Sequence, residues 1–225
     1  MAIFDKEAKD YDSWYTTKMG EFVDRVETEL AMSLFKVEPG MKILDVGCGT
    51  GNFSIKLAEQ GCRVVAIDQS KEMLKNAIKK SEEKGLDIEF HCMDVYDMKF
   101  PDNKFDGVIS MAAFEFIKEP QKAYDEMYRV LKPKGSLLIG TINRESKWGE
   151  LYNSDTFQKN SVFKYADFKS MDDMKSWNSK EVIASGECLF LPPTTEEDFI
   201  SLELEKELSV TEKGGFISVM WQKGV

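Results

Sequence analysis

An apolar run that ends in a glycine-rich turn carries the strongest chemical signal in this sequence. Residues 43–46, Ile-Leu-Asp-Val, are too short for a buried helix and are typical of a buried parallel strand. Gly47, Gly49 and Gly51 follow, and residues 53–58 then show helical spacing. Glycine is needed where the backbone takes positive φ or where a ligand approaches closer than a Cβ allows. Strand, glycine turn and helix in this order predict the first crossover of a nucleotide-binding α/β sheet.

Two acidic residues distinguish the nucleotides that such a turn could bind. A dinucleotide fold uses G-x-G-x-x-G to seat a pyrophosphate on a helix N-terminus, whereas the spacing here is G-x-G-x-G. Asp45 precedes the first glycine, and its carboxylate would repel a pyrophosphate but suit an amino group beside a sulfonium. Asp68 ends the next apolar run, where an acid can accept hydrogen bonds from ribose hydroxyls. The pattern predicts S-adenosylmethionine (SAM) and disfavours a nicotinamide-dependent oxidoreductase.

Five short motifs, in order, resemble the class I SAM-dependent methyltransferases. The resemblance is to the small-molecule branch that includes the ubiquinone and menaquinone C-methyltransferases, of the methyltransferase type 11-like kind. The motifs are LDVGCGTG at 44–51, IDQS at 67–70, MDV at 93–95, FDGVIS at 105–110 and LKPKG at 131–135. The resemblance covers about residues 10–145. It implies methyl transfer from SAM, with S-adenosylhomocysteine (SAH) as the product.

Regular alternation of apolar runs and helical patterns predicts one α/β domain with a doubly wound sheet. With the resemblance, we expect a Rossmann-like, seven-stranded, mostly parallel sheet with helices on both faces and an antiparallel last strand at 216–221, paired with a strand at 187–191. Residues 132–135 are expected to form a turn. The expected segments are an N-terminal helical lid (1–38), a SAM-binding core (39–142), an α-rich substrate cap inserted after the fifth strand (143–180) and closing strands (181–225).

The resemblance also implies a cofactor site. The glycine turn would hold the amino-acid end of SAM with Asp45 near the ammonium, Asp68 would hold the ribose, and Asp94 would accept from the adenine amino group. The full expected set is Tyr11, Tyr15, Asp45, Gly47, Cys48, Gly49, Gly51, Asp68, Gln69, Met73, Asp94, Val95 and Met111. The tyrosines could close over the cofactor or simply pack on the sheet edge, and Met73 also suits the core.

Residues after the fourth apolar run are candidates for acceptor chemistry. The Asn-Pro-Pro-Tyr motif of amino-directed DNA and some protein methyltransferases is absent there, and Phe114 and Glu115 stand where many small-molecule relatives have a histidine. Glu115 is the candidate catalytic residue, as a base or a cation anchor, unless it only serves a helix N-terminus. Phe114, Arg144, Trp148 and Tyr152 are candidate substrate-binding residues: aromatic rings wall off water and an arginine can hold a carboxylate. The alternative is a cap packed only for stability.

Composition restricts the partners. The chain of 225 residues has a formal net charge of −10, which argues against a nucleic-acid substrate. No apolar run approaches the roughly 20 residues that span a bilayer, so no membrane partner is expected, and the start lacks a secretory pattern. Cysteine spacing predicts no metal site. We expect a cytoplasmic monomer or homodimer that methylates a small molecule. The alternatives are a protein or nucleic-acid methyltransferase and a non-catalytic SAM-binding regulator.

Overall fold

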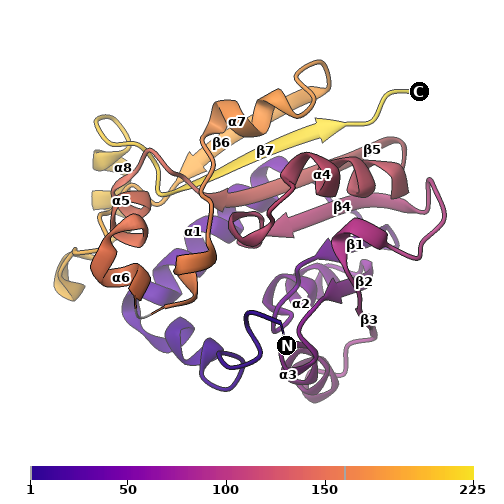
Figure 1. The fold of residues 1–225 in the computed structure, drawn as a ribbon, viewed down its shortest axis with the longest axis horizontal. Helices are drawn as coiled ribbons and strands as arrows, with labels where there is room; N and C mark the ends of the chain where they lie inside the picture. The colour runs from indigo at the N-terminus through magenta and orange to yellow at the C-terminus, as the bar shows by residue number, and fades with distance from the viewer. Residues whose placement is uncertain (1, 160) are drawn as a thin grey trace.

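Strands of the protein form one sheet with the order β3-β2-β1-β4-β5-β7-β6 (Figure 1). The computed structural model describes residues 2–159 and 161–225; Met1 and Asn160, which fall in the expected lid and cap, lie outside the described residues. Strand β7 pairs antiparallel with β5 and β6, and the other pairings are parallel. This confirms the predicted Rossmann-like fold.

The strands are β1 (Lys42–Val46), β2 (Arg63–Asp68), β3 (Ile88–Cys92), β4 (Phe105–Met111), β5 (Leu131–Ile142), β6 (Val182–Cys188) and β7 (Phe216–Gln222). The α-helices are α1 (Lys18–Leu34), α2 (Asn52–Glu59), α3 (Lys71–Glu83), α4 (Pro120–Val130), α5 (Lys147–Asn153), α6 (Asp155–Lys159), α7 (Met171–Ser176) and α8 (Leu202–Leu208). The 3-10 helices are η1 (Tyr11–Thr16), η2 (Val95–Asp97), η3 (Phe114–Phe116), η4 (Val162–Tyr165) and η5 (Glu197–Phe199).

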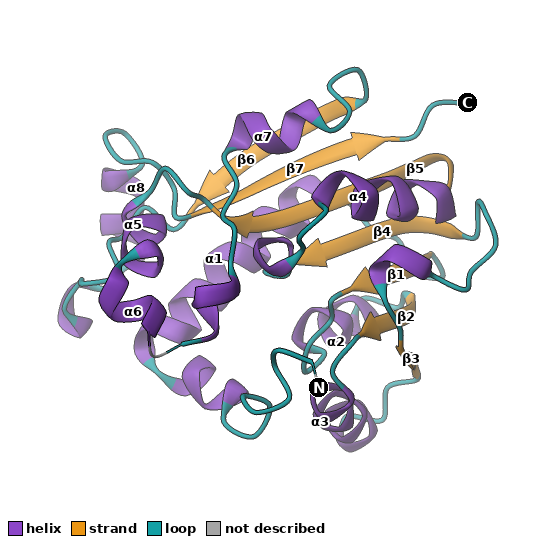
Figure 2. Cartoon of the chain, viewed as in Figure 1, coloured by secondary structure: helices purple, strands orange, loops and turns teal. Residues whose placement is uncertain are grey.

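Both faces of the sheet are covered, which explains why its central strands are apolar throughout. Leu44 and Val46 of β1 pack in the cluster that includes residues of α4 and α7, whereas Ile43 packs with residues of α1 and α2 on the opposite face. Figure 2 shows these helices on the two sides of the sheet. The carboxyl ends of the parallel strands are left free to bear a site.

The N-terminal segment, residues 2–16, crosses that carboxyl end (Figure 1). Polar contacts attach it to the core: Ser70 Oγ donates to Asp5 Oδ1 at 2.7 Å, and Asn76 Nδ2 donates to the Ala8 carbonyl at 2.6 Å. Lys80 Nζ lies 2.8 Å from an oxygen of Asp12. The segment is therefore held against α3.

Two predicted details were wrong. The expected turn at 132–135 lies within β5, because Leu131 pairs with Phe105 and the ladder resumes after a register shift where Gly107 pairs with Ser136. The expected strand at 187–191 runs instead from Val182 to Cys188 and stops where Leu189 takes a φ of 65°. The closing segment also contains α8.

Substitution of Gly51 should test the contact between the glycine turn and α3. Its φ is 80°, and an added Cβ would lie 3.0 Å from the Ala77 Cβ; Gly40 has a φ of 88° but open space around the same position. We expect Gly40→Ala to cost about 1 kcal/mol of unfolding free energy for the left-handed backbone. Gly51→Ala should cost roughly 1 kcal/mol more, because α3 must move. Urea denaturation measures both, and equal losses would contradict the proposed contact.

Candidate functional site

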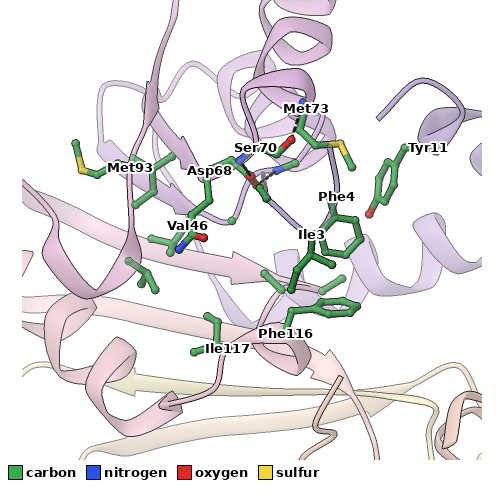
Figure 3. A pocket seen from close by; sticks show the side chains of 18 residues that line it. Ile3, Phe4, Tyr11, Val46, Asp68, Ser70, Met73, Met93, Phe116 and Ile117 are labelled. Carbon is green, nitrogen blue, oxygen red and sulfur yellow. Dashed lines mark hydrogen bonds between the residues drawn. The ribbon is translucent and has the colours of Figure 1, made fainter. Parts of the chain in front are cut away.

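Three neighbouring cavities lie at the carboxyl end of the parallel strands. Cavity A, of about 160 Å³, is lined by strand ends including Val46, Asp68 and Val95 and by Ile3 and Phe4 of the N-terminal segment. Figure 3 shows Ile3 and Phe4 between Ser70 and Met73 on one side and Phe116 on the other.

Cavity B, of about 70 Å³, lies beside the glycine turn and is lined by Asp45, Cys48 and Glu27 among others. Cavity C, of about 390 Å³, lies under the cap and is lined by Glu27, Glu115, Trp148 and Tyr152 among others.

Asp68 organises the wall of cavity A. The Gly49 amide donates to its Oδ2 at 2.8 Å, and the Ser70 amide donates to its Oδ1 at 2.7 Å. Burial raises the pKa of Asp68, although these amides oppose the shift. Each carboxylate oxygen can accept a second hydrogen bond. The carboxylate is therefore positioned to accept from neighbouring hydroxyls of a ligand.

The three glycines of the turn have different surroundings. Only at Gly49 would an added Cβ meet open space, and this residue lines cavities A and B. A Cβ at Gly47 would lie 2.6 Å from the Ala113 Cβ, and Gly51 faces Ala77 of α3. Gly49 thus allows a ligand to approach the backbone, whereas Gly51, which we expected at the cofactor, lies outside the three cavities and allows α2 and α3 to pack.

Acidic groups dominate cavity B. Asp45 is buried, and Ser54 Oγ donates to it at 2.5 Å. Burial is the main cause that raises the pKa of Asp45 to about 7, and the charge of Asp68 adds to it. Asp24 and Glu27 also line the wall, and no Lys or Arg does so among the described residues. This environment suits a cationic group.

Cavity C combines aromatic walls with carboxylates. The rings of Tyr152 and Phe163 stack with centroids 4.2 Å apart. Glu115 of η3 is only 2% exposed, and Thr141 Oγ1 donates to its Oε2 at 2.8 Å. Burial raises the pKa of Glu115 to about 7, against the lowering effects of its own backbone, Thr141 and Lys169. This carboxyl group can exchange a proton near neutral pH.

Tyr11 and Ala112 line all three cavities. Ala112 follows β4 and takes a φ of 51°, an unusual backbone conformation of the kind that gathers at functional sites. Burial raises the pKa of Tyr11 to about 12, so its hydroxyl stays protonated and can donate a hydrogen bond. A ligand in A and B and a second one in C would meet at these residues.

The structure brings together most of the residues singled out from the sequence. Those that line cavity A are Tyr11, Gly47, Gly49, Asp68, Gln69, Met73 and Val95; cavity B adds Tyr15, Asp45, Cys48 and Met111, and cavity C adds Glu115, Trp148 and Tyr152.

Three further expected residues lie outside these cavities. Phe114 is fully buried in the core, where its ring packs on Trp177 with centroids 5.3 Å apart, because η3 directs it away from cavity C. Arg144 forms an ion pair with Asp173 at 2.9 Å. Asp94 is exposed and accepts from the Tyr96 amide, although its neighbour Val95 lines cavity A. A wall position for Phe114, expected from the sequence, is thus incorrect.

Sequence reasoning missed Ile3, Phe4, Glu27, Ala112 and Phe116. For Glu27 there was a signal: it follows Val23 by one helical turn, so a carboxylate lies on the apolar face of α1. The others reach the site through the path of the N-terminal segment and the backbone after β4, which no spacing indicates.

The described residues also show whether disulfides, metal sites or membrane-spanning helices are present. All four cysteines, each in the described part of the chain, are free thiols. Residues 2–159 and 161–225 contain no group of three or more His, Cys, Asp or Glu that could hold a metal ion. In these same ranges, no helix combines the length and the apolar character needed to cross a membrane.

Comparisons with known proteins agree with this geometry. Residues 44–139 match the methyltransferase domain family. An uncharacterized protein of Methanocaldococcus jannaschii is 31% identical over 228 residues, which is 99% of this chain and all of that protein. The ubiquinone biosynthesis O-methyltransferase of Coxiella burnetii is 33% identical over 108 residues, and these cover 48% of this chain and 46% of that enzyme. The alignment thus spans less than half of the Coxiella enzyme.

The fold itself is also found in solved structures. A SAM-dependent methyltransferase of Thermotoga maritima, described as a possible histamine N-methyltransferase, superimposes with a TM-score of 0.74 at 21% identity and 98% coverage of both chains. Its likeness concerns the fold. With the domain match, the full-length relative and the strand-end carboxylates, it follows that this chain belongs to the class I SAM-dependent methyltransferases of the type 11-like group.

Proposed function

We propose that this protein transfers the methyl group of SAM to a small-molecule acceptor bound in cavity C. The observation that carries the proposal is the meeting of cavities A, B and C at Tyr11 and Ala112. The volume of cavity C, about 390 Å³, is within the range of small-molecule sites. The net charge of −10 disfavours a nucleic-acid acceptor.

The residues of cavities A and B fit SAM. The free lone pairs of Asp68 would accept from the ribose hydroxyls, and the open space at Gly49 would admit the ligand next to the backbone. The acidic wall with Asp45 would face the ammonium of the amino-acid end. SAM supplies an electrophilic methyl group on a sulfonium.

The protein itself would position the two ligands, exclude water and transfer a proton. Tyr11 lines all three cavities, so an acceptor in cavity C would lie next to the cofactor site. Trp148 and Tyr152 form an apolar wall that displaces water. Glu115 would anchor a positive charge or take a proton from the acceptor, because its raised pKa makes it a better base than an exposed carboxylate.

Transfer of labelled methyl groups tests this function. The protein is incubated with methyl-labelled SAM and with a cell extract divided by ultrafiltration into small molecules and macromolecules. We expect enzyme-dependent label in the small-molecule fraction. Label in proteins or nucleic acids would contradict the proposed acceptor class. No transfer to either fraction, with SAH binding intact, would favour the non-catalytic regulator.

The variant Asp68→Asn tests whether Asp68 binds the cofactor, independently of its effect on the stability of the protein without ligand. SAH at a hundred times its dissociation constant stabilises a folded protein by roughly 2.7 kcal/mol. We expect the thermal shift with SAH to disappear in the variant, because the amide nitrogen that replaces one carboxylate oxygen accepts a hydrogen bond neither from a backbone amide nor from a ribose hydroxyl. Asp97→Asn, at an exposed carboxylate paired with Lys99, is the matched control and should keep the shift. A retained shift in Asp68→Asn would exclude Asp68 as the ribose ligand.

The affinity for SAH should depend on pH through Asp45. Its raised pKa, about 7, means that the carboxyl group is mostly protonated at about pH 5.5 and ionised at about pH 8. Only the ionised form attracts the ammonium of SAH, so binding should tighten roughly tenfold over this range. In Asp45→Asn the change should shrink to the smaller part contributed by Asp68 and Glu27, whose pKa values are also raised. Calorimetric titration at both pH values measures this, and identical pH profiles would refute the assignment.

A further inference from the structure

Glu27 is a carboxylate that borders both the proposed SAM site and the proposed acceptor site. It projects from α1 and lines both cavity B and cavity C. No hydrogen bond or ion pair is formed by its side chain within residues 2–159 and 161–225, and the nearby Lys56 is engaged by Asp24 and Thr28. Burial, and next the charge of Glu115, hold the pKa of Glu27 well above its usual range.

Four carboxylates line cavity C: Glu27 and Glu115, which repel each other, and the more exposed Glu7 and Asp10 of the N-terminal segment. Glu27 and Glu115 come from α1 and η3, two elements far apart in the sequence, and no Lys or Arg lines the cavity in the described part of the chain. Lys169 acts on Glu115 from outside the cavity and is bonded to Asp167. A buried acid and a half-buried acid without a cation between them are unfavourable, and a bound cation would stabilise the ionised form of both.

The rest of the cavity also suits a cation with an organic part. Tyr11, Tyr15, Trp148 and Tyr152 line it, and aromatic faces attract ammonium groups. An anionic acceptor would find no counter-charge, because Arg144, the residue we considered for a substrate carboxylate, pairs with Asp173 outside the cavity. A carboxylate or phosphate would instead meet Glu27 and Glu115.

On the basis of the proposed function, we propose that the methyl acceptor is an amine, with its nitrogen between Glu27 and Glu115 and its organic part against the aromatic wall of cavity C. This assigns Glu27 as a substrate-binding residue and gives the chemical class of the substrate.

An amine acceptor gives a reaction in which every proton and electron pair is accounted for. An ammonium ion has no lone pair, so Glu115 first takes a proton and leaves a neutral amine. The lone pair then forms the N–CH3 bond while the S–CH3 bond breaks with its electron pair on sulfur, which yields a thioether and a methylated ammonium ion. The proton on Glu115 leaves to solvent. The groups that face Glu115 during this transfer are Thr141, Lys169, Glu27, Tyr11 and Tyr152.

Matched ligands test the proposal. Phenethylamine, 2-phenylethanol and phenylacetate share one skeleton, as do butylamine, butanol and butyrate. Each is titrated into the protein saturated with SAH at about pH 8, where Glu115, whose pKa is raised to about 7, is ionised. In at least one set we expect the amine to bind about tenfold or more tightly than the alcohol and the carboxylate to bind most weakly, because hydrogen bonds between charged groups are stronger than those between neutral groups.

Variants identify the groups responsible. Glu115→Gln and Glu27→Gln should each remove most of the preference for the amine over the alcohol, whereas Glu29→Gln, an exposed residue of the same helix paired with Arg25, should retain it. Wild-type amine binding at about pH 7 should also release protons, seen as different heats in phosphate and Tris, because the cation favours the ionised carboxylates. Alcohol binding should not.

The outcomes separate the two proposals. If SAH binds but neither amine is preferred, or if the preference survives both substitutions, the amine assignment is wrong while the methyltransferase proposal stands. If SAH itself does not bind, the proposed function fails. Because Glu115 lines cavity C and not cavity B, normal SAH binding by Glu115→Gln shows that the variant is folded.

Discussion

The hydrogen bonds accepted by the Asp68 carboxylate hold together the part of the structure that surrounds cavity A. It receives the Gly49 amide from the turn after β1 and the Ser70 amide from the start of α3, so one side chain joins two crossovers of the sheet. Ser70 extends the connection, because its hydroxyl accepts from the Met73 amide of α3 and donates to Asp5 of the N-terminal segment. Cavity A lies between the glycine turn, the start of α3 and the N-terminal segment. Its shape therefore depends on Asp68 at the end of β2, which links them.

Desolvation of carboxyl groups is the common electrostatic feature of the site. Burial raises the pKa values of Asp45, Asp68, Glu27 and Glu115, and each then increases the cost of ionising its neighbours. Such groups lower the free energy of unfolding as the pH rises from the ordinary carboxyl pKa of about 4 to the raised values, since the unfolded chain ionises them more easily. A stable core would replace them with apolar side chains. Their presence is better explained by cationic ligands, which would neutralise them only when bound.

Local patterns located the strand ends and the glycine turn that line cavities A and B, whereas long-range packing decides which other residues reach the cavities. The run 43–46, the glycine turn and Asp68 could be located because strand ends and turn geometry are properties of neighbouring residues. The positions of Phe4 and Ala112 follow from a segment that crosses the sheet and from one backbone conformation. Phe114 was misplaced because the direction of a side chain in a short 3-10 helix depends on what packs around it.

This division has a consequence for specificity. The family match covers residues 44–139, which include Asp45, Asp68 and Glu115 but not Tyr11, Glu27 or Tyr152. The matched domain therefore contains Glu115 and the carboxylates that we propose for the donor site, whereas α1, the N-terminal segment and the cap supply Glu27, the other two carboxylates of cavity C and most of its aromatic wall. Relatives could keep the same methyl donor and exchange their acceptors through changes in these outer elements alone. An acceptor assigned from the domain match would thus rest on the part of the chain that contacts it least.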